Sequence, residues 1–562
     1  MLQSVVGLVR RALIWSLLAG VLTLPAGTGT GDSQATVRVP VVDEYVVLYA
    51  EGVAPGTARA AIAAAGGTIL RENPAVGVAT VRVTRHDGRF LAAVGLQTAL
   101  AGATPNLPIG RLAREVTPGM LPQETANGGP QTGSDPLTSR QWDMGAIGAT
   151  ADGAHKIQAG DKRVLVGVID SGVDGSHPDI APNFDLALSR NFTTDIPEFD
   201  GPCEHPDCVD PPDEDGNGHG THVAGTIAAA RNGIGIAGVA PNVTIVNLRA
   251  GQDSGLFLVG SVVAALTYAG DIGIDVANMS FYIDPWLYNC PNNAADSPEA
   301  QQAQRATIEA TQRALDYARA RGVTLVSAAG NGHTDLDRAT DDTTSPNFPN
   351  GAAYPRTIDR TCLSMPSDGA GVISVTAIGP SGRKAYYSDY GLTHADIAAP
   401  GGDQLDYYGT PQYQPASNQI LSTYPKAILL AEGSIDAAGN VTRRGADVVR
   451  DCQGDVCAYY RYLQGTSMAA PHVAGVLALI ISQYGAPSLR DPGGLTLSPI
   501  RAERILLATA TPRACPLQNP VTYPGLPSSS APRYAARCEG AEGRNGFYGV
   551  GVVDARRAVG GE

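Results

Sequence analysis

The sequence predicts an α/β fold with a doubly wound, mostly parallel sheet, preceded by a small α+β unit. Short, continuous apolar runs recur from residue 163 onward, as expected for strands that are buried on both faces. Stretches of helical length separate these runs, and such alternation is typical of βαβ units. Residues 42–113 differ, because short apolar strands alternate there with Ala-rich helical segments.

The N-terminal unit comprises residues 42–113. We expect its strands at residues 42–50, 68–70 and 76–83, and its helices at residues 56–65 and 90–100. Gly66 and Gly67 follow the first of these helices and are suited to ending it. Residues 114–134 are rich in Pro, Gly and polar residues without periodicity, which predicts a linker.

The large domain extends over residues 135–558. Its expected strands are 163–169, 243–248, 276–280, 323–328 and 371–377, and its expected helices are 219–230, 260–269 and 303–321. Gly270 and Gly322 are placed to end two of the helices. Three polar or turn-rich segments interrupt the alternation, and we expect them to be surface insertions: 195–215, 335–366 and 402–461. In sheets of this type, functional residues gather at the carboxyl ends of the strands.

Composition and charge restrict the class of protein. Of 562 residues, 43% are apolar and 17% are charged, which is enough for a large core. The net charge is −14, so we expect no nucleic-acid partner. Residues 1–134 hold 10 basic and 8 acidic residues, whereas the rest of the chain holds 30 and 46. The acidic excess therefore belongs to the large domain.

Residues 1–26 have the pattern of a secretory signal peptide. Arg10 and Arg11 precede an apolar run over residues 12–24. That run is shorter than the roughly 20 residues that a membrane-spanning helix needs. We therefore favour cleavage and secretion over the alternative, a permanent membrane anchor.

The chain contains eight cysteines, an even number behind a signal peptide, which favours disulfides. Zinc binding is the alternative, but zinc sites usually have tighter CxxC pairs than the two C-x4-C pairs found here. Proximity in sequence suggests three bridges and leaves one pair as a remainder. The suggested bridges are Cys203–Cys208, Cys452–Cys457 and Cys515–Cys538, and the remainder is Cys290 with Cys362.

Three short stretches place reactive side chains beside glycines. Asp170 follows the apolar run 163–169, where a carboxylate often only caps a turn. His219 and His222 lie three residues apart on one predicted helix face, a spacing that suits either a metal pair or a base in the first helical turn. Ser467 follows Gly465 and Thr466 at a helix start, where it is either an N-cap or a nucleophile favoured by the helix dipole.

Taken together, in the order Asp, His, Ser, these stretches resemble the active-site signatures of subtilisin-like serine peptidases, the subtilase family, for which this order is established. Supporting similarities are SAAGN at residues 327–331, DIAAPG at 396–401 and GVGVVD at 549–554. The resemblance extends over roughly residues 135–558. It implies a secreted serine endopeptidase that is made as an inactive precursor.

The resemblance also implies the role of each residue. Ser467 attacks the scissile carbonyl, His219 accepts and returns its proton, and Asp170 orients the imidazole. Asn331 donates its side-chain amide to the oxyanion, together with the backbone N–H of Ser467. For His222 and His472, which occupy positions that the family uses structurally, we expect a structural role.

Members of this family bind extended peptides or proteins as an added strand, so backbone pairing and side-chain pockets both matter. The matching edges are Asp253-Ser254-Gly255 and the segment that ends at Ser280. After this serine the family commonly has Leu-Gly-Gly, whereas this chain has Phe281 and Tyr282. We expect the bulky side chains to narrow or reshape the primary pocket, and the sequence predicts no preferred substrate residue.

Calcium is the expected cofactor, in a structural role. The family's strong site is matched by Asp179, by Asn232, and by the carbonyls of Ala230, Ile234 and Ile236, with Asp135 as a further carboxylate. Oxygen-only ligation of this kind suits Ca²⁺. An ordinary Asx turn at Asn232 is the alternative.

Residues 42–113 resemble the family's inhibitory pro-domain in layout, with residues 114–134 as the processing region. Such a domain covers the catalytic unit, assists its folding and is cut away, which leaves a monomer with one domain. Two other functions stay open: a non-catalytic surface-binding protein on a peptidase scaffold, and a zinc hydrolase that uses His219 and His222.

Overall fold

A computed structural model of the chain describes residues 44–83, 89–106, 135–338, 340–347, 352–488, 493–526 and 534–561. The predicted signal peptide at residues 1–26 and the predicted linker at 114–134 lie outside these ranges.

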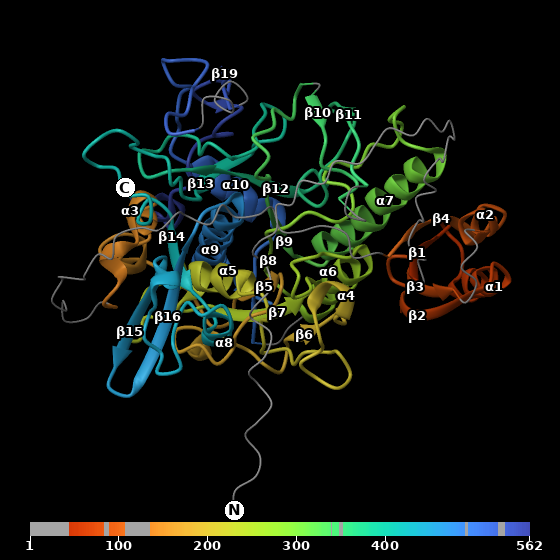
Figure 1. Cartoon of the computed structure of the whole chain (residues 1–562), viewed down its shortest axis with the longest axis horizontal. Helices are drawn as coiled ribbons and strands as arrows, with labels where there is room; N and C mark the ends of the chain where they lie inside the picture. Colours follow the sequence, from red (N-terminus) through yellow and green to blue (C-terminus); the bar gives the residue numbers. More distant parts are fainter. Residues whose placement is uncertain are drawn as a thin grey trace, which may run out of the picture. The chain divides into compact units, whose positions relative to one another are not determined.

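The large domain is built on a seven-stranded sheet (Figure 1). Every pair of neighbouring strands is parallel, which confirms the predicted doubly wound fold class. The strands, from one edge to the other, are β13 (Ile397–Pro400), β12 (Val372–Ile378), β9 (Thr324–Ala328), β8 (Val276–Met279), β5 (Leu165–Ile169), β7 (Thr244–Arg249) and β6 (Arg190–Asn191). The five strands that the sequence predicts are all present in this sheet.

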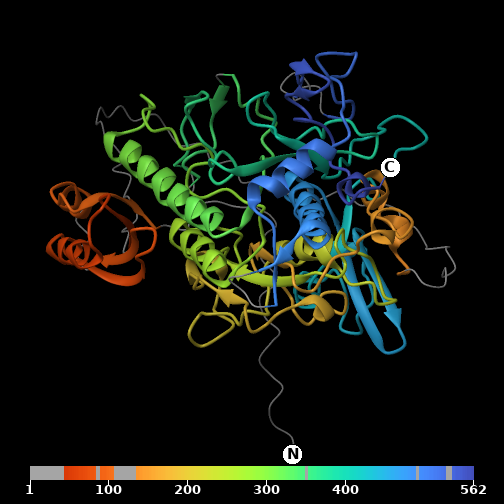
Figure 2. The same ribbon diagram turned by 180° about the vertical axis from the view of Figure 1, so that it is seen from behind.

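Helices cover both faces of the sheet. Helices α5 (His219–Ala228) and α9 (Thr466–Tyr484) share one apolar core with Val166 and Val168 of β5. Helices α6 (Val259–Ile272) and α7 (Pro298–Ala320) share a second core with Ile169 at the end of the same strand. Figure 2 shows the two green helices α6 and α7 side by side, apart from the blue helix α9.

Helix α9 is long and apolar enough to cross a membrane by length and composition. It lies instead within the protein, and its residues from Thr466 to Ile481 are all buried. Its hydropathy is therefore that of a core helix.

The prediction that Gly270 ends a helix is wrong. Helix α6 continues to Ile272, and Gly273, with φ +80°, adopts the left-handed conformation that ends it. Gly270 lies inside the helix, where an added Cβ would be 3.3 Å from the Cα of Ala318 in α7. Its missing side chain thus lets the two helices approach closely. Gly322 does lie just after α7, with φ +103°.

The N-terminal unit contains an antiparallel sheet in the order β2-β3-β1-β4, with helices α1 (Pro55–Ala64) and α2 (Arg89–Gly95). Its strands are β1 (Glu44–Tyr49), β2 (Gly67–Asn73), β3 (Val78–Val83) and β4 (Leu100–Pro105). The helix expected over residues 90–100 is shorter, and the sequence analysis missed β4. Pairing of β4 with β1 decides this segment, because tertiary context overrides weak local propensity.

Residues 402–461 are only partly a surface insertion. They supply the antiparallel strands β14 (Ile420–Thr423), β15 (Val448–Gln453) and most of β16 (Val456–Leu463). Tyr459 and Tyr460 of β16 are 2% and 0% exposed, so the expectation of a surface segment is wrong there. The reason is that this sheet packs against helix α5, where the hydroxyl of Ser422 donates to the carbonyl of His222 at 2.7 Å.

The described residues contain five further α-helices and six further strands. They are α3 (Trp142–Ala146), α4 (Pro197–Asp200), α8 (Lys426–Ala431), α10 (Pro499–Thr509), α11 (Ala555–Ala558), β10 (Thr340–Asp342), β11 (Arg356–Ile358), β17 (Ala486–Pro487), β18 (Leu495–Thr496), β19 (Gly540–Ala541) and β20 (Arg544–Asn545).

Four disulfides join all eight cysteines, and none of the cysteines is free. The bridges are Cys203–Cys208, Cys452–Cys457, Cys515–Cys538 and Cys290–Cys362. The first three follow proximity in sequence, and the fourth joins the pair that was left over.

Candidate active site

Asp170 and His219 meet at the carboxyl end of strand β5. Asp170 directly follows the strand, is fully buried, and accepts a hydrogen bond from Nδ1 of His219 at 2.7 Å. His219 is the first residue of α5. A Cβ at the next residue, Gly220, would lie 2.0 Å from the carbonyl oxygen of Gly172, so only glycine permits this close approach. Because a carboxylate oxygen can only accept, Nδ1 of His219 donates to Asp170. Nε2 of His219 is then the ring nitrogen that can accept a proton.

Asp215 holds the first turn of α5 and was missed by the sequence analysis. Its carboxylate accepts hydrogen bonds from the backbone N–H groups of Gly218 at 2.8 Å and Thr221 at 3.0 Å. It also accepts one from the hydroxyl of Ser171, beside Asp170, at 3.1 Å. A carboxylate at a helix N-terminus stabilises the helix, so Asp215 fixes α5 against the turn that contains Asp170. The pattern Asp-x-x-x-His before a predicted helix was the available signal.

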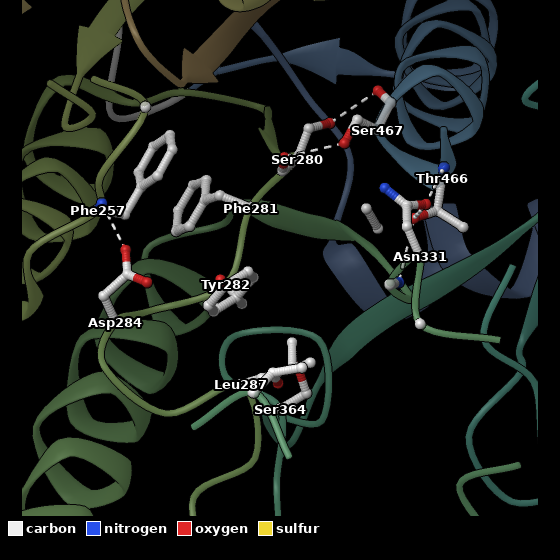
Figure 3. Close-up of a pocket in the computed structure, with 15 residues that line it drawn as sticks. Phe257, Ser280, Phe281, Tyr282, Asp284, Leu287, Asn331, Ser364, Thr466 and Ser467 are labelled. Carbon is white, nitrogen blue, oxygen red and sulfur yellow. Dashed lines mark hydrogen bonds between the residues drawn. The ribbon is translucent and has the colours of Figure 1, made fainter. Parts of the chain in front are cut away.

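Ser467 and Asn331 approach one another at the start of α9 (Figure 3). The hydroxyl of Ser467 donates to the backbone carbonyl of Ser280 at 3.2 Å. Asn331 follows strand β9, and its Oδ1 accepts hydrogen bonds from both the backbone N–H and the hydroxyl of Thr466, each at 2.9 Å. Because both donors engage the oxygen, the side-chain NH₂ of Asn331 makes neither of these two hydrogen bonds. Thr466 is thus a positioning residue that the sequence analysis did not assign.

A cavity of about 260 Å³ adjoins Ser467 and Asn331. Of the six residues predicted to bind substrate, Gly255, Ser280, Phe281 and Tyr282 line it. The ring of Phe281 stacks on that of Phe257, with 4.0 Å between the ring centroids and 4° between the planes (Figure 3). The bulky residues therefore form walls of the cavity rather than filling it.

Asp253 and Ser254 do not line this cavity. Oδ1 of Asp253 instead accepts from Nη2 of the buried Arg249 at 2.8 Å. The backbone N–H of Ser254 donates to Asp200 at 2.9 Å. The structure thus separates these two residues from the other predicted substrate contacts.

His222 and His472 both have structural surroundings. Nε2 of His222 lies 3.1 Å from the carbonyl oxygens of Ile420 and Arg461, and burial lowers the pKa of His222 to about 3. His472 bridges the carbonyl of Met468 at 2.7 Å and the carboxylate of Asp143 at 3.0 Å. The groups of potential metal ligands found among the described residues contain neither His219 nor His222, and they contain neither Asp135 nor Asp179.

The predicted calcium ligands lie close together. Oδ1 of Asp135 accepts from the backbone N–H groups of Asn232 at 3.0 Å and Gly233 at 2.7 Å. Oδ2 of Asp179 accepts from the N–H of Ile236 at 3.1 Å and from the hydroxyl of Tyr460 at 2.8 Å. Oδ1 of Asp179 is buried without a hydrogen-bond partner among the described residues. An unsatisfied buried carboxylate oxygen fits a hard cation such as Ca²⁺. Oδ1 of Asn232 accepts from the backbone N–H of Ile234 at 3.2 Å, so the Asx turn named as the alternative is also present.

A second acidic region surrounds the buried Arg249, in and beside segment 195–215. One group of possible ligands comprises Asp195, Glu204 and Asp253, and another comprises His205, Asp210 and Glu214. Arg249 pairs with Asp210, Asp253 and Asp195. The single charge of Arg249 therefore offsets one of the five acidic charges in these groups, and the groups could hold a metal.

Comparison with known proteins defines the class. The sequence model described as Subtilase family matches residues 161–551, and the chain therefore belongs to the subtilase family. It is 28% identical over 363 residues to subtilisin DY of Bacillus licheniformis, an alignment that covers 64% of this chain and 88% of that protein. It is 30% identical over 339 residues to subtilisin Savinase of Lederbergia lenta, an alignment that covers 60% of this chain and 83% of that protein. The chain is thus a serine-type endopeptidase that acts on peptides or proteins.

Solved structures show the same fold. The epidermin leader peptide processing serine protease of Staphylococcus aureus matches with a TM-score of 0.61 at 22% identity, over 92% of this chain and 98% of that chain. Fervidolysin of Fervidobacterium pennivorans matches with a TM-score of 0.57 at 23% identity, over 93% of this chain and 61% of that chain.

Proposed function

We propose that Asp170, His219 and Ser467 form the catalytic triad of this endopeptidase. The observation that supports the proposal most strongly is the buried hydrogen bond of 2.7 Å between Asp170 and Nδ1 of His219, which leaves Nε2 as the base. Ser467 lies at the N-terminus of α9, where its backbone N–H and the helix dipole favour developing negative charge.

In the proposed reaction, His219 removes the hydroxyl proton as Oγ of Ser467 attacks the scissile carbonyl carbon. The carbonyl oxygen becomes an oxyanion, which the amide of Asn331 and the backbone N–H of Ser467 stabilise. His219 then gives its proton to the leaving amine as the C–N bond breaks, and an acyl-enzyme remains. Water then attacks the carbonyl carbon of the acyl-enzyme, with His219 again as base. The ester bond to Ser467 breaks, His219 returns the proton to Oγ, and the acid product leaves. Asp170 stabilises the imidazolium that forms in each half-reaction.

Hydrolysis of casein by the purified protein tests the triad. Ser467→Ala should lose the activity, and His219→Ala should lose it as well. Ser482→Ala, on the same helix α9 but toward its other end, is the matched control and should keep the wild-type rate. Full activity of Ser467→Ala would refute the proposal.

We also propose that residues 42–113 are an inhibitory pro-domain, followed by a processing region at 114–134 and a catalytic domain at 135–558. Contacts between the N-terminal sheet and helices α6 and α7 support this. Asn106 accepts a hydrogen bond from the backbone N–H of Gly260, in the first turn of α6, at 3.0 Å. Arg313 of α7 donates to the carbonyl of Tyr49 at 2.9 Å.

This proposal has two further parts. The chain is secreted behind a signal peptide at residues 1–26 that is cleaved and does not remain as a membrane anchor, and the mature enzyme is a monomer. Intact mass with N-terminal sequencing of the protein from the culture medium tests both cleavages. A mature N-terminus near residue 135 is the expected result. An active form that keeps residues 42–113 covalently attached would contradict the precursor model, and sedimentation of the mature enzyme tests the monomer.

We propose further that Asp135, Asp179, Asn232 and the carbonyls of Ala230, Ile234 and Ile236 hold a structural Ca²⁺. The buried, unpartnered oxygen of Asp179 supports this assignment. A bound ion would stabilise the folded state by mass action. Calcium should therefore raise the thermal midpoint of the Ser467→Ala protein, and Asp179→Asn should remove that increase. An equal increase in both proteins would place the ion elsewhere.

A further inference from the structure

The cavity beside Ser467 has an acidic residue in its lining that has no role in the proposed catalytic triad. Asp284 lines the same cavity as Ser467 and Asn331 (Figure 3). It is 5% exposed, its Oδ2 accepts from the backbone N–H of Phe257 at 3.0 Å, and its Oδ1 accepts from Nδ2 of Asn347 at 3.2 Å. The carboxylate is therefore fixed in position by two neutral donors.

Asp284 is a buried acid with no cationic partner among the described residues, as Asp179 is, whereas several other buried acids of this protein have one. Arg356 pairs with Asp296 at 2.9 Å and with Asp342 at 3.0 Å. Arg249 likewise pairs with the acids around it. At Asp284, burial raises the pKa well above its ordinary value, and no basic side chain opposes that effect. A buried carboxylate without a counter-charge is costly, unless a ligand supplies the charge.

We propose that this cavity receives a cationic side chain of the substrate, arginine or lysine, at the residue whose carbonyl Ser467 attacks, and that Asp284 is its counter-charge. The proposal rests on the proposed function, since it needs Ser467 to be the nucleophile. It gives the endopeptidase a specificity for cleavage after basic residues.

The cavity suits such a side chain in size and polarity. Its volume of about 260 Å³ is several times the roughly 30 Å³ that a water molecule occupies in the liquid. Phe257, Phe281 and Leu287 provide apolar walls against which the methylene groups of arginine or lysine can pack. A carboxylate has about four acceptor positions, and two of those on Asp284 are taken, so it can still accept from a guanidinium or ammonium group.

The charge of the large domain acts in the same direction. The sequence from residue 135 onward has 46 acidic and 30 basic residues. Such an excess attracts cationic peptides over a distance and raises their rate of encounter. It does not distinguish one position of the peptide from another, so the choice of the residue before the scissile bond would fall to Asp284.

Peptides that differ only at the residue before the scissile bond test the proposal. Arginine, lysine, glutamine and leucine are compared by kcat/KM, first with the wild-type mature enzyme. Arginine or lysine should exceed glutamine by at least about 30-fold, as expected for a buried charge pair. Preference of the wild-type enzyme for glutamine or leucine would overturn the proposal without any variant.

Asp284→Asn keeps the shape of the side chain and removes its charge. It should lower kcat/KM for the arginine peptide by at least about 30-fold and change that for the leucine peptide by less than about threefold. Asp455→Asn, in the exposed turn between β15 and β16, removes the same charge far from the cavity and should leave both values unchanged. An equal loss on all four peptides in Asp284→Asn would refute the role of Asp284 in specificity.

Two further measurements make the outcome independent of the folding of Asp284→Asn. Benzamidine, an aromatic amidinium, should inhibit the wild-type enzyme competitively, and absence of competition would contradict the proposal. Labelling of Ser467 by a phosphonofluoridate reports the triad alone. A labelled enzyme that cleaves only after neutral residues refutes the specificity, whereas an unlabelled enzyme that cleaves no peptide refutes the proposed function.

Discussion

Replacement of Thr466 by valine tests how Asn331, the proposed oxyanion donor, is held. The hydroxyl of Thr466 donates to Oδ1 of Asn331 at 2.9 Å and accepts from the backbone N–H of Gly330 at 3.1 Å. Valine keeps the shape of the buried side chain but has no hydroxyl, so both hydrogen bonds are lost. The backbone N–H of residue 466 still donates to Asn331, which keeps the amide near its position.

The size of the effect follows from one lost hydrogen bond on Asn331. A typical bond contributes a net of about 0.5–1.5 kcal/mol, which corresponds to a loss of about 2- to 13-fold in kcat if all of it acts on the transition state. Removal of the corresponding Asn side chain in subtilisin costs about 100- to 1,000-fold, so Asn331→Ala should be far more severe than Thr466→Val. The unsatisfied N–H of Gly330 should also lower the free energy of unfolding by about 1–3 kcal/mol.

Steady-state kinetics on a short peptide, with active-site titration, measures this directly. Thr466→Val should lower kcat and leave KM within about twofold, because the oxyanion forms only in the transition state. Thr466→Ser, which retains the hydroxyl, is the matched control and should remain near wild type. A Thr466→Val enzyme with unchanged kcat, or with a raised KM and normal kcat, would refute the role of Thr466 in orienting Asn331.

Three other predictions concern stability, measured in the inactive Ser467→Ala protein to prevent self-digestion. Burial lowers the pKa of His222 to about 3, so below pH about 6.5 the unfolded state binds the extra proton, and the free energy of unfolding should fall by up to about 1.4 kcal/mol per pH unit. In urea titrations between pH 7 and 4, the free energy of unfolding should fall less steeply with falling pH in His222→Gln than in the protein that keeps His222. An equal fall in both proteins would contradict this prediction. His472→Ala should cost about 3–5 kcal/mol at pH 7 because it leaves the buried Asp143 carboxylate without its partner, and a loss below 1 kcal/mol would contradict that reasoning. Calcium at 100 times its dissociation constant should add about 2.7 kcal/mol, and Asp179→Asn should abolish this gain.

The sequence was sufficient for the parallel sheet because buried strands have a local signature. Residues 163–169 and 323–328 are apolar without interruption, and both became central strands. Asp170, His219 and Ser467 could be selected because each stands at a glycine-rich junction between a strand or turn and a helix. The rule that functional residues gather at the carboxyl ends of parallel strands places Asp170 beside His219, whereas the approach of Ser467 to His219 belongs to the proposed triad.

Residues whose role depends on distant partners could not be predicted in this way. Strand β4 has a weak local preference and forms because β1 offers an edge for pairing. Tyr459 and Tyr460 lie in segment 402–461, whose composition predicts a surface location. They are buried because β16 packs near α5 and the loop of Asp179. Asp284 is one acid within an apolar stretch, and only the folded chain shows that it shares a cavity with Ser467.

Reaction with a phosphonofluoridate followed by mass spectrometry tests whether Ser467 is the nucleophile of this endopeptidase. The mature wild-type protein should gain one adduct, located on the peptide that contains Ser467, and lose its casein hydrolysis in proportion. Ser467→Ala should gain none, and His219→Ala should react far more slowly. A stoichiometric adduct at any other residue, or casein hydrolysis that survives complete modification of Ser467, would contradict the assignment of the triad.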